Sequence, residues 1–242
     1  MIMTIRGAIL CGLLAAALGV PGGGQDTMIK ADPSHYLDDI KAELKKEWPA
    51  NRTVNLVFHG HSVPAGYFKT PEVRTLEAYP HLLLTELRRT YPLSVINVIV
   101  TAIGGENAVQ GEARFGEVLA HKPDVVFIDY ALNDRGTPPD QAGAAWESMI
   151  RQALAKNVKV ILLTPTPDQT ENILDPDAPL AARTRRIEEL AARFGVGLVD
   201  SYGAFKDFAT AGGRPADLMS QVNHPNEKGH RLVAAEIIHF FN

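Results

Sequence analysis

Cysteine is almost absent from this sequence, with one residue, Cys11, among 242. A disulfide-based scaffold and a zinc site built from cysteines are therefore excluded. The chain also lacks an excess of charge of one sign, since 24 Lys and Arg residues against 28 Asp and Glu residues give a formal net charge of -4. Such a balance provides neither the basic surface that nucleic-acid binding requires nor a polybasic membrane anchor.

Internal repeats and low-complexity stretches are also missing. Hydrophobic residues make up 45% of the chain and charged residues 21%, which is an ordinary globular composition and excludes a disordered or fibrous protein. The length is sufficient for one domain with a sizeable core.

The N-terminus holds the one long apolar run, Ala8–Leu18, which follows Arg6 and precedes a glycine-rich stretch. This order is typical of a secretory signal peptide. We therefore predict a signal peptide and spacer over residues 1–24, a single domain over residues 25–242, and an exported protein without stable membrane association after cleavage. A membrane-anchored N-terminal helix is the alternative, although the run is shorter than the roughly 20 apolar residues that a spanning helix needs.

Short Val- and Ile-rich strands alternate with longer amphipathic segments along the remaining chain. Nearly continuous apolar strands of this kind are typical of a parallel sheet that is buried on both faces. The predicted strands are Thr53–Phe58, Val95–Val100, Val125–Tyr130, Val158–Leu163 and Val196–Val199. The predicted helices cover residues 34–48 (with Ser34 as the cap), 72–89, 107–120, 140–156, 181–193 and 226–241. The alternation predicts a three-layer α/β domain with a mostly parallel five-stranded sheet.

Polar residues that could carry out acyl transfer follow the strands, where ligands bind in such sheets. Ser62, at the turn after the first strand, is the candidate nucleophile, and His224 is the candidate base that its hydroxyl requires. The backbone N–H of Gly105 and the side chain of Asn133 are candidate donors to an oxyanion.

Each of these residues also has a simpler structural interpretation. A serine after a strand is most often a helix cap, and a Gly-Gly pair or an Asn-Asp pair often forms a turn. We interpret Asp134 as structural and Asp200 as a helix cap. Arg135 is either a substrate contact or a solvated surface residue.

Four sequence blocks resemble the SGNH (GDSL-type) hydrolase family, in the order in which that family carries them. They are Gly60-His61-Ser62, Gly105 within Gly104-Gly105-Glu106, Ala131-Leu132-Asn133-Asp134, and His224-Pro225-Asn226. The resemblance extends from Thr53 to the end of the chain. It implies a flavodoxin-like sheet and a serine esterase that needs no metal or other cofactor, with Ser62 and His224 as catalytic residues. It also implies an oxyanion hole formed by Ser62, Gly105 and Asn133.

The chain departs from the family pattern at two positions. His61 replaces the aspartate of the first block, which normally supports the loop. Gln221 replaces the aspartate that usually stands three residues before the histidine, and an amide stabilises an imidazolium less well than a carboxylate. Three explanations are open: Gln221 or a backbone carbonyl orients His224, Asp217 takes the role of the acid, or activity is weak or lost.

Two other classes of protein compete with the esterase. A metallohydrolase would use the His59-Gly60-His61 pair, completed by His224 and Asp134. A carbohydrate-binding module without activity would tolerate Gln221. Within the esterase class we expect short acyl groups, acetyl above all, on a carbohydrate or small ester, and a lipid or aryl esterase is the alternative. The segment from Val63 to Pro80 is expected to form one wall of the pocket.

Overall fold

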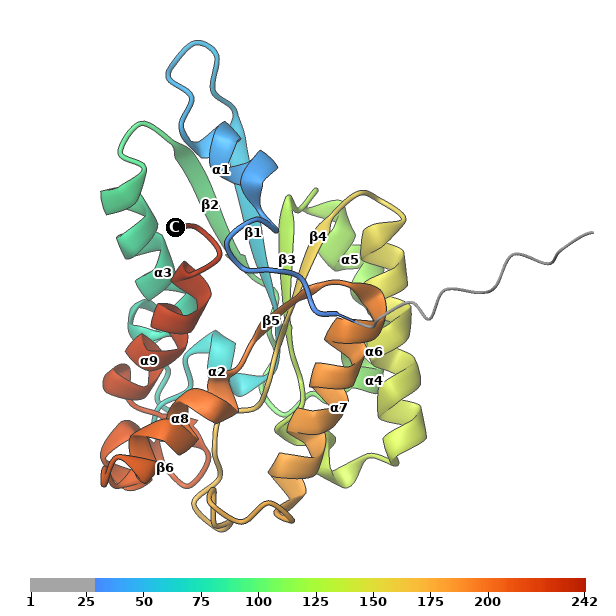
Figure 1. Ribbon diagram of the computed structural model, residues 1–242, viewed down its shortest axis with the longest axis vertical. Helices are drawn as coiled ribbons and strands as arrows, with labels where there is room; N and C mark the ends of the chain where they lie inside the picture. The colour runs from blue at the N-terminus through green and yellow to red at the C-terminus, as the bar shows by residue number, and fades with distance from the viewer. Residues whose placement is uncertain (1–28) are drawn as a thin grey trace, which may run out of the picture.

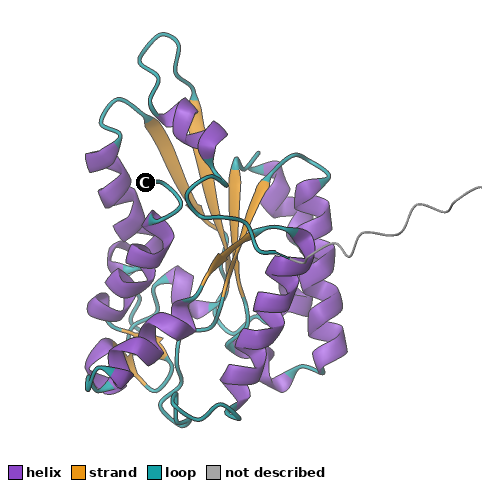
Figure 2. Ribbon diagram, viewed as in Figure 1, coloured by secondary structure: helices purple, strands orange, loops and turns teal. Residues whose placement is uncertain are grey.

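A sheet of five parallel strands forms the centre of the structure, a computed structural model that describes residues 29–242 (Figure 1; Figure 2). The strands are β1 (Thr53–Gly60), β2 (Val95–Val100), β3 (Val125–Asp129), β4 (Lys159–Leu163) and β5 (Gly197–Val199), in the order β2-β1-β3-β4-β5. This is the flavodoxin-like order, and it confirms the predicted fold class. The predicted signal peptide and spacer lie outside the described residues.

Helices cover both faces of the sheet and complete the three layers (Figure 1). One face is covered by α1 (Asp38–Leu44), α3 (Tyr79–Thr90), α8 (Ser201–Thr210) and α9 (Glu227–Ile238). The other face is covered by α4 (Ala108–Ala113), α5 (Phe115–Ala120), α6 (Pro139–Leu154) and α7 (Pro179–Phe194). Among residues 29–242, no helix is both long enough and apolar enough to cross a membrane.

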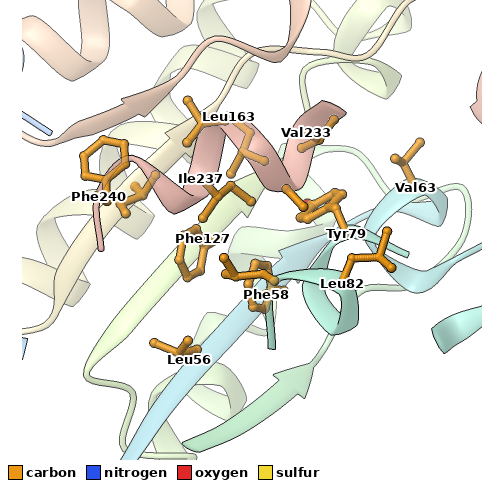
Figure 3. Packing of buried hydrophobic residues seen from close by; sticks show 14 of the residues in the cluster. Leu56, Phe58, Val63, Tyr79, Leu82, Phe127, Leu163, Val233, Ile237 and Phe240 are labelled. Atoms are coloured by element: carbon orange, nitrogen blue, oxygen red, sulfur yellow. The ribbon is translucent and has the colours of Figure 1, made fainter. Parts of the chain in front are cut away.

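Alternate residues of each strand point to opposite faces and build two separate cores. In β1, Leu56 and Phe58 join the cluster beneath α3 and α9 (Figure 3). Val57 joins the cluster beneath α5 and α6. Phe58 stacks on Phe127 of β3 with ring centroids 4.3 Å apart. Because β3 and β4 are buried on both faces, their sequences are nearly continuous apolar runs, whereas the edge strand β2 is partly exposed.

The predicted helices are correct in place but differ in extent. The helix predicted over residues 34–48 is the shorter α1, and Ser34 does not cap it, because its hydroxyl binds the Asp32 carboxylate instead. The helix predicted over 72–89 begins only at Tyr79, after a 3₁₀ turn, since the proline in its first turn favours a helix start there. The helix predicted over 107–120 is divided into α4 and α5 at Arg114.

Several short elements were not predicted. They are α2 (Ser62–Ala65), α8, the 3₁₀ turns η1 (Thr75–Glu77), η2 (Asn133–Gly136) and η3 (Pro215–Leu218), and a hairpin of β6 (Met219–Gln221) and β7 (His224–Pro225). Asp200 caps α8 by accepting a hydrogen bond from the Gly203 N–H, as predicted. The catalytic candidates Ser62, Asn133 and His224 all lie in these short elements, which follow the sheet rather than belong to it.

Candidate active site

Ser62 is the first residue of α2, directly after β1. His61 caps this helix, because its Nδ1 accepts a hydrogen bond from the Val63 N–H at 3.2 Å. The Val63 side chain is fully buried in the core and anchors the helix (Figure 3). The backbone must also pass close to β3, where a Cβ on Gly60 would lie 2.4 Å from the Asp129 carbonyl oxygen. The capped, anchored helix α2 and the close approach of Gly60 to β3 together fix the position of the Ser62 hydroxyl.

His224 lies on β7 and faces this hydroxyl, with its Nε2 2.9 Å from Ser62 Oγ. Both side chains are largely buried. Burial lowers the pKa of His224 below its usual value, the Phe68 carbonyl partly opposes this shift, and His61 adds to it. A lowered pKa keeps the imidazole neutral near pH 7, and a general base must be neutral before it can accept a proton.

The other ring nitrogen of His224 has two neighbours. Nδ1 lies 2.8 Å from Gln221 Nε2 and 3.3 Å from the Phe68 carbonyl oxygen. The Gln221 amide also binds the opposite loop, since its Oε1 accepts the Thr70 N–H at 3.0 Å. Asp217 lies apart from this group, because its exposed carboxylate binds Arg214 at 2.6 Å.

Gly105 and Asn133 line the same cleft as Ser62 and His224. Gly105 has a φ of +84°, a conformation that a side chain would strain, although a Cβ there would meet no other atom. Asn133 Nδ2 donates to the Glu106 carbonyl at 2.8 Å. An amide nitrogen carries two hydrogens, so this bond orients the side chain and leaves one N–H for an oxyanion.

A buried polar network supports the Gly105 loop. Arg114 Nε binds the Glu106 carboxylate at 2.8 Å, and Arg114 Nη2 donates to the Thr101 carbonyl at 2.7 Å. The Tyr130 hydroxyl donates to the same carboxylate at 3.2 Å. His59 completes the network through contacts with Thr101 and Tyr130, and burial lowers the pKa of His59 to about 4.

His61 takes part in a different group of contacts. Its Nε2 lies 3.4 Å from Asp129 Oδ1, and the Tyr79 hydroxyl donates to Asp129 Oδ2 at 3.0 Å. His59 and His61 therefore contact separate sets of residues. Within the described part of the chain, no three His, Cys, Asp or Glu side chains come together as metal ligands would.

The remaining predicted polar residues are structural. Asp134 accepts hydrogen bonds from the Ala108 N–H at 2.8 Å and from Trp146 Nε1 at 2.7 Å, as expected for a structural residue. Arg135 is not among the residues that line the cleft, and its partly exposed side chain pairs with Asp168 and Glu171.

The cleft that contains Ser62 and His224 has a volume of about 370 Å³. Its wall includes Tyr67 and Thr70 from the segment expected to form it, whereas Tyr79 of the same segment is buried beneath the site. The Tyr67 ring lies over Gly104, where a Cβ would be 3.0 Å from Tyr67 Cζ. The cleft is lined by Ser62, Tyr67, Thr70, Gly104, Gly105, Asn133, Gln221, Asn223 and His224.

Sequence reasoning did not identify several groups in and around the site. The Phe68 carbonyl and the Thr70 N–H are backbone groups, which no residue type signals. Asn223 stands beside His224 and could have been noted from that position alone. The Glu106–Arg114 pair joins the loop before α4 to the residue between α4 and α5, eight positions later, and no helical or strand spacing predicts it.

Residues 58–232 match the GDSL-like Lipase/Acylhydrolase family, which accounts for most of the chain and all of the residues of the cleft. The chain belongs to this family. It is accordingly a carboxylic ester hydrolase. No curated protein sequence matches it.

Solved structures with a similar fold include two carbohydrate esterases. The acetylxylan esterase Axe2 from Geobacillus stearothermophilus is 25% identical with a TM-score of 0.67, over 78% of this chain and 94% of Axe2. The two-domain esterase CEX, active on acetylated mannans, is 19% identical with a TM-score of 0.70, over 88% of this chain and 54% of CEX. Two further Axe2 structures are of catalytic mutants, in which a histidine and a serine, respectively, are replaced by alanine.

Proposed function

We propose that this chain is a serine esterase that removes acetyl groups from a carbohydrate. The observation that carries the proposal is the 2.9 Å contact between His224 Nε2 and Ser62 Oγ, at the edge of a polar cleft that also contains Gly105 and Asn133. A hydroxyl, a neutral base and converging N–H donors are the parts that acyl transfer requires. The serine and histidine mutants of Axe2 support the assignment by analogy.

The proposed reaction has two steps. Ser62 Oγ attacks the ester carbonyl carbon while its proton passes to His224 Nε2, and the backbone N–H groups of Ser62 and Gly105 and the Asn133 amide stabilise the oxyanion. The proton on His224 then moves to the leaving alkoxide as the C–O bond breaks, which leaves an acetyl-serine. A water molecule, deprotonated by His224, attacks this ester, and acetate leaves as Ser62 recovers its proton.

The lining of the cleft supports a sugar-bound acetyl group rather than a long acyl chain. Thr70, Asn133, Gln221 and Asn223 present hydroxyl and amide groups, and Tyr67 adds an aromatic ring. No aliphatic side chain is among the described residues that line it. Amides, hydroxyls and aromatic faces suit sugar hydroxyls and C–H faces, whereas a lipid chain would need an apolar surface to bury its methylenes.

The names of similar structures point to the same substrate class, because Axe2 is an acetylxylan esterase and CEX is active on acetylated mannans. A polymeric substrate of this kind fits the export that residues 1–24 predict. Export itself stays a prediction.

A fluorophosphonate probe and an acetate-release assay test the proposal together. We expect the probe to label the protein covalently at Ser62, and acetate to be released from acetylated xylo-oligosaccharides or mannan oligosaccharides. Ser62→Ala should remove both while the melting temperature stays near that of the wild type.

The alternatives predict different results in the same assays. Preference for triglyceride or aryl esters over acetylated oligosaccharides would replace the carbohydrate assignment. Binding of oligosaccharide without labelling or release would identify a carbohydrate-binding relative. Turnover that persists in Ser62→Ala would contradict the serine mechanism.

A further inference from the structure

The orientation of the Gln221 amide follows from its partner on the opposite loop. The Thr70 N–H lies 3.0 Å from Oε1 of Gln221, and a backbone N–H can only donate. The atom that faces Thr70 must therefore be the amide oxygen. A second contact agrees with this orientation, because Gln221 Nε2 lies 3.4 Å from Thr70 Oγ1, an oxygen that can accept.

With the oxygen bound to Thr70, the amide nitrogen of Gln221 faces His224. Its distance to Nδ1 is 2.8 Å, and an amide nitrogen can only donate. Nδ1 must then be the unprotonated nitrogen, so the single proton of the neutral ring is on Nε2. In this tautomer Nε2–H donates to Ser62 Oγ and has no lone pair to take up the serine proton.

The catalytic tautomer requires the opposite arrangement. Nε2 must be free to accept the Ser62 proton, and Nδ1 must carry a hydrogen, which needs an acceptor. The Phe68 carbonyl oxygen lies 3.3 Å from Nδ1 and can accept it. The amide nitrogen of Gln221 cannot accept this hydrogen. An Nδ1–H and the amide N–H would be two donors facing each other at 2.8 Å, and they would repel. Gln221 and Phe68 thus favour different tautomers of the same ring.

We propose that Gln221 is a positioning residue that holds His224 in its resting, Nε2-protonated tautomer, and that the Phe68 carbonyl stabilises the working tautomer. The proposal rests on the proposed function. It implies a built-in limit on the rate, because only the fraction of molecules whose ring proton is on Nδ1 can be acylated. It also makes the loop that carries Phe68 and Thr70 part of the catalytic machinery.

Two substitutions of Gln221 should raise kcat if the amide holds the resting tautomer, and should lower kcat if the amide assists catalysis. Glutamate keeps the length of Gln221 and supplies two acceptors, one for the Thr70 N–H and one for Nδ1–H. We expect Gln221→Glu to raise kcat on an acetyl ester at least about tenfold, since an amide in place of a triad carboxylate costs about 10⁴ in a serine protease. Gln221→Met fills similar space without a donor, so it should also raise kcat, by a smaller factor, with the Phe68 carbonyl as the acceptor.

Histidine tautomers can be read directly and without substrate, by ¹⁵N–¹H NMR of the ring nitrogens. We expect the wild type to carry the His224 proton on Nε2, and Gln221→Glu to carry it on Nδ1, with His224→Ala used to assign the signal. Gln141→Glu, an exposed residue of α6, adds the same charge far from the imidazole and should change neither the tautomer nor the rate.

The outcomes separate this proposal from the proposed function. A wild-type proton on Nδ1 would overturn the proposal, as would a drop in kcat for both substitutions, since the amide would then be helping catalysis. If the proton moves as expected but no variant hydrolyses any ester, the tautomer assignment stands and the esterase assignment fails.

Discussion

The two halves of the candidate cleft are held in place by different kinds of structure. The half that carries Ser62, Gly105 and Asn133 follows directly from the parallel sheet and rests on buried polar contacts. The half that carries His224 is a short hairpin, β6 and β7, held to the neighbouring loop by Gln221 and Thr70 near the surface. Contacts beneath the cleft support the half with Ser62, whereas a contact with the neighbouring loop supports the hairpin.

This difference bears on the two departures from the family pattern. In the buried half, His61 replaces an aspartate, and the structure supplies a carboxylate nearby in Asp129, which lies 3.4 Å from His61 and is itself bound by Tyr79. On the hairpin, Gln221 replaces an aspartate, and the two partners of His224 Nδ1 are an amide and a carbonyl. The buried half thus places a carboxylate beside the substituted residue, without a hydrogen bond between His61 Nε2 and Asp129 Oδ1, whereas the hairpin places an amide and a carbonyl beside His224.

The sharpest test of the buried half is Asn133→Ala. If the Asn133 amide donates to the oxyanion, its removal should lower kcat by about 10² to 10³ with little change in KM, because the bond strengthens only as charge develops. Steady-state kinetics on an acetyl ester measure this. A loss below about fivefold would mean that the bond to the Glu106 carbonyl is the sole role of Asn133.

Arg114→Met tests whether the support beneath Gly105 is needed. The substitution leaves the Glu106 carboxylate, whose side chain is 13% exposed, without its cation. We expect the unfolding free energy to fall by about 2 kcal/mol, between the values for exposed and fully buried pairs, and kcat to fall by about tenfold. Urea unfolding and kinetics measure the two effects. The double variant Arg114→Met with Glu106→Gln should recover part of the lost stability. No recovery would argue against the Arg114–Glu106 ion pair.

The pH dependence of kcat/KM tests the electrostatics of the hairpin half. In the proposed reaction His224 acts as a base only when neutral, so activity should rise as pH increases through its pKa. Because burial lowers that pKa, the rise should be centred below the ordinary histidine value of about 6.5. Gln221→Glu should move the rise to higher pH, since a carboxylate stabilises the imidazolium. A wild-type midpoint above 6.5 would contradict the effect of burial.

The smallest expected effect is that of Asp217→Asn. Its exposed carboxylate binds Arg214 and not His224, so kcat and KM should stay within error of the wild type. A large loss of activity would mean that the hairpin rearranges during turnover to bring Asp217 to the histidine.

The sheet could be predicted because its strands are buried on both faces and leave a simple apolar signal. Ser62, Gly105 and Asn133 could be placed in one cleft because each follows a strand and lies in a block that resembles the family, and their catalytic roles stay predictions. The orientation of His224 could not, because its neighbours include the Phe68 carbonyl and the Thr70 N–H, which carry no residue-specific signal. Short elements such as α2 could not be predicted from hydrophobic periodicity, since four residues are too few to show it.

Ser62 and His224 are separated by 162 residues of sequence yet meet at 2.9 Å. Bringing such distant segments together is slow, because chain entropy must be lost before the contact contributes stability. Ester turnover is therefore a reporter of folding as well as of chemistry. Returning activity during refolding should lag behind the recovery of helical circular dichroism, because local helices form before β1 and the C-terminal hairpin come together.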